Sequence, residues 1–394
     1  MPQALDILII GGGIAGCSAA IALSDRGHRV RIVERQPEWR FQSSGIFVYA
    51  NGLVSMAALG LLDEIVAAGF AVAEGRNLYL DHHGDPITET LYPTPDAAQM
   101  PAILGIKRAE MHRVMAARVG ALGVPMQLGT TVDGIEQDGA GVTVTLSDGT
   151  SARYDLVVGA DGVRSATRTQ IGVNLAPRYT GFGVWRSVHR RPPDLTDKIM
   201  MMGPAKRFGI MPISEDRLYT FGTVAEPGNA YYPPEDWPGL MRSRFAEFEG
   251  PARAFLDELG PDSETLYTAV EEVVLPLPWH RGRVVLIGDA AHAATPFMGQ
   301  GGAMAMQDAV VLADALSRID GLDEALTAFG AARLPVCQFV QEVSRKVGEA
   351  GAEEVGADLG PRNARLRDTA QSAVDGFYDR LDGLIREGEA RLRA

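Results

Sequence analysis

Apolar and polar positions in the first 34 residues predict a strand, a glycine turn, a helix and a second strand. Residues 7–10 form a continuous apolar run, which is typical of a parallel strand covered on both faces. Residues 14–25 are favourable for a helix, and Gly27 is placed to end it. Apolar residues return over 30–33. This order predicts one βαβ unit.

The pattern changes twice further along the chain. Residues 142–147 alternate apolar and polar and lead through Asp148-Gly149 into another strand, which predicts a hairpin. Buried strands are expected over 154–160 and 284–287. Between them, short alternating strands, prolines at 192, 193, 227, 233, 234 and 238 and one polar helix near 239–259 indicate an inserted sheet-rich domain. The last fifty residues are charged and helical, with a break near Gly360-Pro361.

These elements predict an α/β fold with a Rossmann-like domain that is discontinuous in sequence. We expect it to comprise residues 1–177 and 276–345, followed by C-terminal helices over 346–394. The inserted substrate domain is expected over 178–275, with residues of about 76–100 contributing to it. A chain of 394 residues is long enough for two such domains.

Composition narrows the class of protein. The sequence is 46% hydrophobic and 22% charged, as in ordinary soluble globular proteins. Its net charge of −13 argues against nucleic-acid partners and anionic membranes. Cys17 and Cys337 are too few for a disulfide framework, and neither a signal peptide nor an apolar run of membrane-spanning length is visible. We therefore expect a cytoplasmic protein, monomeric or homodimeric.

The glycine turn carries the first chemical signal. Gly11-Gly12-Gly13-Ile14-Ala15-Gly16 fits G-x-G-x-x-G between a strand and a helix, and Glu34 ends the next strand. In dinucleotide-binding proteins the glycines allow a tight turn, approach of the backbone to a pyrophosphate and close helix packing, while the acid binds a ribose hydroxyl. An acid at this position favours an unphosphorylated ribose.

Two later segments suggest a longer cofactor. Asp161-Gly162 follows one buried strand, and residues 288–302, GDAAHAATPFMGQGG, follow another. The second segment runs through Pro296 and three glycines into a helix, whose N-terminal N–H groups suit a negative or electron-rich ligand. No second G-x-G-x-x-G is present, so a dedicated nicotinamide domain is not expected.

In their order and spacing, these three motifs resemble the single-component, or class A, flavin-dependent aromatic monooxygenases, typified by para-hydroxybenzoate and salicylate hydroxylases. The resemblance covers about residues 5–345. It implies a bound FAD in the Rossmann-like domain, with NAD(P)H as a transient co-substrate. The positions that the resemblance assigns to FAD binding are Gly11, Gly13, Ala15, Gly16, Glu34, Arg35, Gly45, Arg108, Val132, Asp161, Asp289 and Gly302.

The resemblance also implies a reaction. NAD(P)H reduces FAD, O₂ forms a flavin hydroperoxide, and one oxygen atom passes to an aromatic or conjugated small molecule. Pro296, Gly299, Gln300 and Gly301 would lie beside the isoalloxazine ring, with the helix N-terminus stabilising negative charge on the reduced ring.

The substrate pocket is less well defined by sequence. By motif register, its candidate residues are Phe47, Tyr49, Trp185, Arg207, Phe208, Met211 and Phe297, each of which could equally be core. Ala50 replaces a proline of the family pattern, Met211 stands where several phenol hydroxylases have a tyrosine, and Arg207 where they often have a histidine. No general base is therefore evident, and the substrate could be already activated, anionic and paired with Arg207, or apolar.

Several other residues have a plain structural interpretation. His82-His83 is expected in a solvated loop, so no metal is expected there; His292 is expected to be structural, Cys17 to be inert, and Arg186 to lie at the surface or in an ion pair. An apolar helical face formed by Phe377, Leu381, Leu384 and Ile385 covers either the core or a partner subunit.

Other functions remain open on the same scaffold. An epoxidase, an N-oxygenase or a reductase would share these motifs, and a flavin-binding redox sensor would share the cofactor site. A flavin halogenase is disfavoured because the four tryptophans form no W-x-W pair.

Overall fold

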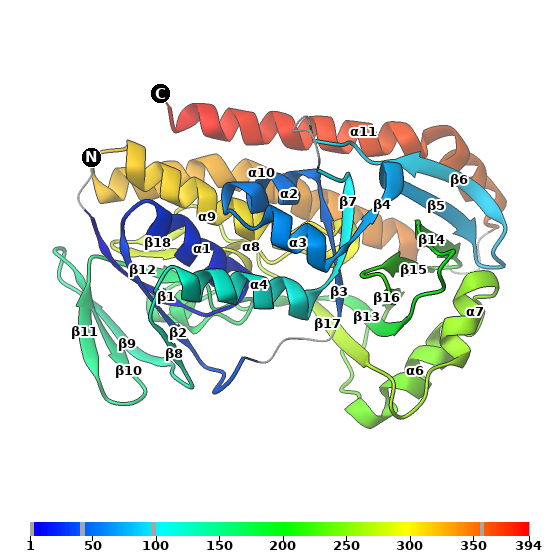
Figure 1. Cartoon of the computed structure of the whole chain (residues 1–394), viewed down its shortest axis with the longest axis horizontal. Coiled ribbons are helices and arrows are strands. Elements are labelled where there is room, and N and C mark those ends of the chain that lie inside the picture. The colour runs from blue at the N-terminus through cyan, green and yellow to red at the C-terminus, as the bar shows by residue number, and fades with distance from the viewer. Residues whose placement is uncertain (1–3, 40–43, 96–99, 355–357, 394) are drawn as a thin grey trace.

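The computed structural model describes residues 4–39, 44–95, 100–354 and 358–393 (Figure 1). The elements of the first half are β1 (Asp6–Ile10), α1 (Ile14–Asp25), β2 (Arg29–Glu34), β3 (Gly45–Tyr49), α2 (Ala50–Ala58), α3 (Leu62–Ala68), β4 (Phe70–Val72), η1 (Ala73–Gly75), β5 (Arg76–Asp81), β6 (Pro86–Leu91), β7 (Ile103–Lys107), α4 (Arg108–Ala121), β8 (Met126–Leu128), β9 (Val132–Gln137), β10 (Val142–Leu146), β11 (Ser151–Tyr154), β12 (Leu156–Gly159) and α5 (Ala166–Gln170). Those of the second half are β13 (Arg178–Arg190), β14 (Lys198–Gly203), β15 (Lys206–Pro212), β16 (Arg217–Ala225), η2 (Pro234–Asp236), α6 (Trp237–Arg244), α7 (Gly250–Asp257), β17 (Thr265–Glu272), β18 (His280–Arg281), β19 (Val284–Leu286), α8 (Asp289–His292), η3 (Pro296–Met298), α9 (Gly301–Arg318), α10 (Leu322–Ala352) and α11 (Gly360–Arg391).

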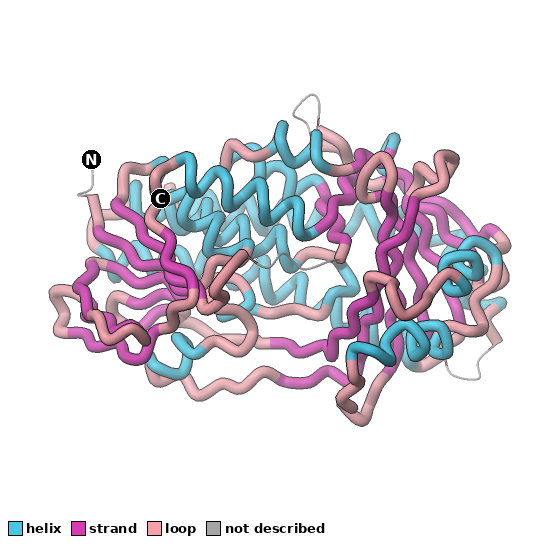
Figure 2. The backbone as a smooth tube through the Cα atoms, turned by 60° about the horizontal axis from the view of Figure 1, so that its bottom comes forward, coloured by secondary structure: helices cyan, strands magenta, loops and turns pink. Residues whose placement is uncertain are grey.

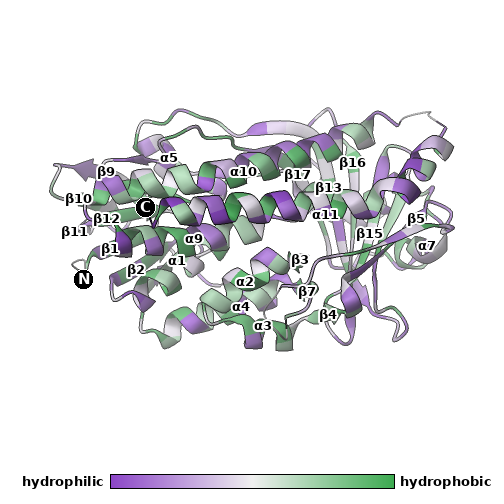
Figure 3. Ribbon diagram, turned by 90° about the horizontal axis from the view of Figure 1, so that it is seen from above, coloured by the Kyte–Doolittle hydropathy of each residue, from purple (hydrophilic) through white to green (hydrophobic). Residues whose placement is uncertain are grey.

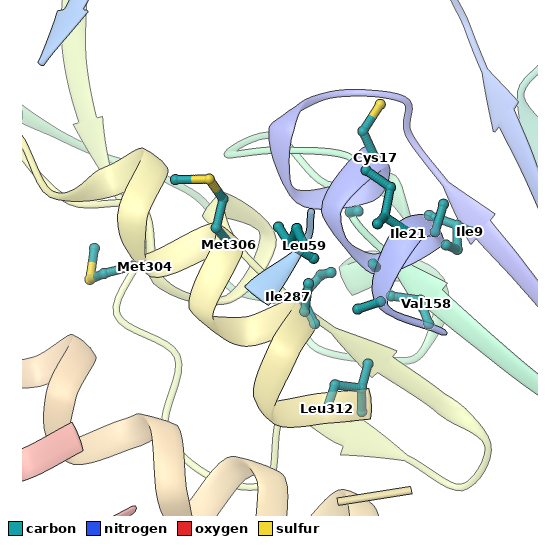
Figure 4. Packing of buried hydrophobic residues seen from close by; sticks show 14 of the residues in the cluster. Ile9, Cys17, Ile21, Leu59, Val158, Ile287, Met304, Met306 and Leu312 are labelled. Atoms are coloured by element: carbon teal, nitrogen blue, oxygen red, sulfur yellow. The ribbon is translucent and has the colours of Figure 1, made fainter. Parts of the chain in front are cut away.

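Within the described ranges, the first large sheet has six strands in the order β18-β19-β12-β1-β2-β8. Its strands pair in parallel except β18 with β19. Helices α1 and α9 pack together against its buried centre, where Ile9, Val158 and Ile287 face them (Figure 4). The apolar run of β1 is therefore covered on both sides, as its sequence predicts.

The hairpin expected near Asp148-Gly149 is formed by β10 and β11, which are antiparallel. The strand expected over 154–160 is interrupted at Asp155, where the chain leaves the small β9–β11 sheet and enters the six-stranded one. The Asp155 carboxylate accepts a hydrogen bond from the backbone N–H of Asp6 at 2.8 Å. The polar Asp155 lies where the chain passes from one sheet to the other, and the hydrophobic pattern alone did not reveal this break.

The second large sheet has the order β17-β13-β16-β15-β14-β5-β6 among the described strands. Strands β5 and β6 join it through parallel pairing of β5 with β14. Its outer face packs on α6 and α7 and encloses a second core, which includes Trp185, Phe208 and Phe245. One helix was expected over 239–259, but Gly250 has a φ of +51° and Pro251 follows it, so the segment folds as α6 and α7.

A three-stranded sheet, β3-β7-β4, lies between the two large sheets (Figure 1), whose strands gather toward the two ends of the molecule (Figure 2). The other face of the seven-stranded sheet, here called the inner face, carries Arg186, Arg207, Met211 and Phe221 at alternate positions. It is turned toward β3 and the C-terminal helices, because Phe221 contacts Phe47 of β3.

Helices α10 and α11 run side by side along the molecule (Figure 3). Phe377 of α11 stacks on Phe339 of α10, with ring centroids 5.4 Å apart, and Leu381 and Leu384 are buried. The apolar face of α11 therefore covers the core of its own chain. No helix in the described part of the chain is long and apolar enough to cross a membrane.

Candidate active site

The loop between β1 and α1 is closely packed at two glycines and open at a third. A Cβ at Gly11, whose φ is +105°, would lie 2.5 Å from the carbonyl oxygen of Ala160, and one at Gly16 would lie 1.9 Å from that of Gly11. A Cβ at Gly13, the N-cap of α1, would meet no atom within 4 Å. The helix N-terminus therefore has open space before it, which suits a phosphate group.

Glu34 helps to hold this loop in place. One carboxylate oxygen accepts the N–H of Gly12 at 2.7 Å, and the other accepts the N–H of Gln36 at 2.8 Å. Two further side chains, which the motif did not indicate, lie against Gly12: a Cβ there would be 2.9 Å from the ring of Trp39, and Nε2 of His112 is 2.6 Å from its carbonyl oxygen. Burial lowers the pKa of His112, which favours a neutral ring that donates to this carbonyl. Arg35 is exposed next to Glu34.

The turn after β19 meets the same loop. Gly288 has a φ of +59°, and a Cβ there would lie 2.8 Å from Cβ of Ala15. Asp289 follows at the start of α8 and is exposed. A Cβ at Gly302 in α9 would come within 4.0 Å of Ile14. The N-termini of α1 and α9 and the Asp289 carboxylate therefore gather around one region.

Arg108 brings a positive charge to this region. It is the first residue of α4, and its N–H donates to the carbonyl of Ser44 at 2.7 Å. Burial lowers the pKa of Arg108, whereas the nearby carboxylate of Asp289 raises it, and Arg186 and Tyr219 also lie close enough to influence it. Arg186, expected at the surface or in an ion pair, is half-buried and donates to Oγ1 of the exposed Thr268 at 2.9 Å beside this site. Arg108 thus links the Asp289 turn to the inner face.

The loop that the family resemblance assigns to the ring of the flavin turns sharply before α9. Residues Pro296–Met298 form the short helix η3, and Gly299 follows in the left-handed conformation with a φ of +64°. A Cβ at Gly301, the first residue of α9, would meet no atom within 4 Å. Gln300 is buried: its side-chain oxygen accepts from Asn51 at 2.8 Å, and its amide nitrogen is 3.4 Å from the hydroxyl of Tyr378.

An aromatic cluster adjoins this loop. A Cβ at Gly299 would lie 3.0 Å from the ring of Tyr49, which fixes the position of the cluster relative to the loop. Phe47 packs on Phe221 and Tyr219 with centroid distances of 5.3 and 5.9 Å, and Tyr49 stacks on Tyr92 at 5.0 Å. The cluster comprises Phe47, Tyr49, Tyr92, Tyr219, Phe221 and Tyr378. Sequence reasoning named only Phe47 and Tyr49, although the alternation of Tyr219 and Phe221 could have placed both on one face of β16.

Three candidate pocket residues are engaged elsewhere. Trp185 and Phe208 are fully buried in the second core on the outer face, so we remove them from the proposed pocket. Strand alternation explains this placement, because both residues lie opposite Gly222, whose outer side contacts Phe245. Arg207 does lie on the inner face, but it forms a two-point ion pair with Glu354 at 2.9 and 2.8 Å.

The other two pocket candidates remain on the side of the aromatic cluster. Met211 is buried on the inner face, and its Cε would be 3.0 Å from a Cβ at Gly105 of β7. Phe297 packs edge-on against Phe182 at 5.1 Å and, with Arg207, lines a small pocket between the inner face and α10.

Two of the expected cofactor residues make local contacts. Asp161 accepts hydrogen bonds from Ser165 Oγ at 2.5 Å and from the N–H of Thr167 at 2.9 Å, so it stabilises the N-terminus of α5, whose N-cap is Ser165. The carbonyl of Val132 accepts from Gln170 at 2.9 Å. Gly45 has a packing role as well, because a Cβ there would lie 2.3 Å from the ring of Tyr219.

A buried network of charged side chains around Asp308 holds the turn that contains Asp289. One carboxylate oxygen of Asp308 accepts a hydrogen bond from Arg333 Nε at 2.7 Å. The other accepts the backbone N–H of Gly288 at 2.7 Å and lies 2.6 Å from His292 Nε2. Asp308 raises the pKa of His292 against the opposing effect of burial. The possible metal-ligating atoms of His292, Asp308 and Cys337 lie within 4.8 Å of one another, but the Asp308 carboxylate already forms an ion pair with the Arg333 guanidinium. We therefore assign the network a structural role.

Cys17 and His83, which the sequence also singled out, lie outside the group of His292, Asp308 and Cys337. Cys17 is buried, and burial raises the pKa of its thiol to about 12, so it is unreactive. His83 pairs with Glu249 at 2.8 Å on the surface, where metal-ligating groups do not gather among the described residues.

The residues present fit FAD. The open spaces at Gly13 and Gly301 are where backbone N–H groups at two helix N-termini face outward, and anionic groups of a ligand are stabilised there. Asp289 follows Gly288, which approaches Ala15, and its carboxylate lies close enough to influence Arg108, while the aromatic cluster adjoins the Gly299 turn that precedes Gly301. A long ligand with a diphosphate in its middle and a flat ring system at one end matches this arrangement.

Comparisons with known proteins also indicate an FAD-binding protein. Residues 4–344 match the FAD binding domain family. Aurachin C monooxygenase/isomerase of Stigmatella aurantiaca is 32% identical over 381 residues, which cover 95% of this chain and 97% of that protein. The 2-heptyl-3-hydroxy-4(1H)-quinolone synthase of Pseudomonas aeruginosa is 32% identical over 387 residues, covering 96% and 97%.

A solved structure is also similar over its full length. HpxO of Klebsiella pneumoniae, crystallised with FAD and uric acid, has a TM-score of 0.83 and 29% identity, covering 95% of this chain and 96% of that chain. The chain therefore belongs to the FAD binding domain family and is an FAD-dependent monooxygenase of the single-component class that its motifs resemble.

Proposed function

We propose that the protein uses FAD, NAD(P)H and O₂ to hydroxylate a planar aromatic or conjugated small molecule. The observation that carries this proposal is the aromatic cluster beside the Gly299 turn, at the end of the cofactor site where the flavin ring is expected. Relatives named for urate, quinolone and aminohydroxybenzoate chemistry support a flat, conjugated substrate.

The chain's own residues would bind, orient and shield the reactants. Bound FAD supplies the oxygen-activating chemistry. The N-terminus of α1 would hold its diphosphate, and Asp289 and Arg108 its ribityl or pyrophosphate region. The N-terminus of α9 would stabilise negative charge on the ring. The rings of Phe47, Tyr219 and Phe221 would stack on the substrate and exclude water.

Oxygen-isotope incorporation tests this function. The FAD-loaded protein is mixed with NADH or NADPH and a panel containing urate, 3-amino-4-hydroxybenzoate and alkyl-4-quinolones. We expect at least one compound to accelerate NAD(P)H oxidation and to gain one ¹⁸O atom from ¹⁸O₂. A product that differs by two hydrogens would instead identify a reductase, and an oxygen atom on a nitrogen or across a double bond would identify an N-oxygenase or an epoxidase. Absence of turnover with the whole panel, despite full FAD loading, would favour a redox sensor.

The preference for NADH or NADPH, the cytoplasmic location and the monomeric or homodimeric state remain predictions from the sequence. Size-exclusion chromatography with light scattering measures the last of these directly.

A further inference from the structure

Lys198 is a buried charged side chain that the mechanism above does not use. Lys198 is the first residue of β14 on the inner face, and only 3% of its surface is exposed. Sequence reasoning gave no sign of it, because a lysine at the start of a strand is ordinarily a surface residue.

The surroundings of Lys198 are aromatic and hydroxylic. Its Nζ donates to the hydroxyl of Tyr49 at 3.1 Å and to that of Tyr92 at 3.3 Å. It also lies 4.7 Å from the ring centre of Tyr92 and 5.4 Å from those of Tyr49 and Phe47, within the range of cation–π attraction. Among the described residues, no Asp or Glu forms an ion pair with Lys198, although Asp197 next to it pairs with Arg76 at 3.2 Å.

This environment makes the ammonium costly. A buried charge without a carboxylate partner loses hydration that hydroxyls and rings restore only in part. Burial lowers the pKa of Lys198 to about 8. The tyrosines stay protonated, since burial raises the pKa of Tyr92 to about 12 and that of Tyr49 well above its usual value. An apolar residue would fill the same space at lower cost, so an anionic ligand is a physical reason for a lysine here.

Tyr49 connects Lys198 to the site of the reaction. Its ring touches the Gly299 turn, and its hydroxyl accepts from Nζ. Phe47, two residues earlier on β3, is half-buried and contacts Phe221. A flat ring that stacks near Phe47 and Phe221 would therefore have the Tyr49 hydroxyl at its edge.

We propose that Lys198, acting through the hydroxyl of Tyr49, selects substrates with an acidic ring O–H or N–H and holds them as anions. When Lys198 is neutral, the substrate proton passes to the Tyr49 oxygen while the Tyr49 proton passes to Lys198. When Lys198 is already an ammonium, the substrate proton leaves to solvent and the Tyr49 hydroxyl, which accepts from the ammonium, donates to the anion. The products are a substrate anion, an intact tyrosine and an ammonium, so one proton and no electrons are transferred. Lys198 is thus a positioning residue, and an anionic ring is more electron-rich and accepts oxygen more readily. This inference rests on the proposed function and narrows its substrate class.

Nuclear magnetic resonance of the lysines tests whether the protonation of Lys198 responds to an acidic ligand. The chain has four lysines, 107, 198, 206 and 346, so selective ¹³C labelling at Cε of the FAD-loaded protein gives a simple spectrum. The Lys198 signal is assigned by its loss in Lys198→Arg. We expect it to titrate near pH 8 and its midpoint to rise when an acidic phenol binds. The exposed Lys346 serves as the reference and is expected not to respond to the ligand.

A coloured ligand tests whether the site holds an acidic ring compound as its anion. The probe is 4-nitrophenol, whose phenolate absorbs visible light and whose neutral form does not, and 4-nitroanisole is the matched ring without an acidic proton. At a pH below the pKa of free 4-nitrophenol, we expect the FAD-loaded wild type to bind it as the phenolate. Lys198→Met should weaken this binding about 10- to 100-fold, the value of one hydrogen bond to a charged group. Lys198→Arg should retain the phenolate, and 4-nitroanisole should bind equally to all three proteins.

Each contrary outcome overturns the inference. These outcomes are a Lys198 signal that ignores phenols, a bound probe that stays neutral, no binding by the wild type, or equal phenolate affinity in Lys198→Met. If Lys198→Met fails to fold, the wild-type titration and Lys198→Arg still decide. Lys346→Met, at an exposed position, controls for loss of a positive charge. The proposed function fails separately, through the absence of ¹⁸O incorporation with any compound, acidic or not.

Discussion

Replacement of Gly13 by alanine separates cofactor binding from folding. Gly13 is the N-cap of α1 with a φ of −74° and a ψ of −167°, angles that alanine adopts without strain. The added methyl group would meet no protein atom within 4 Å. It would instead occupy the open space in which the diphosphate of FAD is expected to lie.

The two expected effects differ in size. Alanine is a poorer N-cap than glycine, so the apoprotein should lose only about 0.5–1 kcal/mol of unfolding free energy. A displaced diphosphate would lose at least one hydrogen bond between a backbone N–H and a charged group, worth about 1.5–3 kcal/mol. The Kd for FAD should therefore rise about 10- to 100-fold, at roughly 1.4 kcal/mol for each factor of ten.

Titration of the apoprotein with FAD, followed by flavin fluorescence, measures the Kd, and urea unfolding of the apoprotein measures stability. Gly376→Ala is the matched control, because Gly376 is exposed within α11 and a Cβ there also meets open space. That change should raise helix stability by up to about 1 kcal/mol and leave the Kd unaltered. An unchanged Kd in Gly13→Ala would refute the assignment of this space to the diphosphate.

Three further substitutions test other parts of the site. Gly16→Ala should cost about 1–3 kcal/mol or more in urea unfolding, because its Cβ would lie 1.9 Å from a backbone oxygen, and a stable variant would contradict that packing. Asp308→Asn should cost about 3–5 kcal/mol, since it leaves the buried charge of Arg333 without its partner; near-wild-type unfolding would show that the network is dispensable. Arg207→Met should cost about 1–2 kcal/mol through loss of the half-buried pair with Glu354 while the Kd for FAD stays constant. A large change in that Kd would show that the pair between Arg207 and Glu354 also supports the cofactor site.

The β1–α1–β2 unit could be predicted from sequence because its signals are local. A continuous apolar strand, glycines at fixed spacing and an acid at the end of β2 each act on neighbouring residues. The structure adds a reason for the glycines at 11 and 16, where any side chain would strike a backbone oxygen. The two helices α6 and α7 were harder to separate, because the break depends on the backbone angle of one glycine.

The sequence by itself determined the α/β class, the glycine loop, the two turns after β12 and β19 and, by resemblance, the flavin chemistry. Only the tertiary structure decided which side of the seven-stranded sheet faces the site. Trp185 and Phe208 fell on the outer face and Tyr219 and Phe221 on the inner one, since neighbouring strands must pair in one register and side chains alternate between faces. Lys198 entered the site for the same reason: pairing of β14 with β5 and β15 carried it from a strand end into an aromatic interior, a long-range contact that no local pattern encodes.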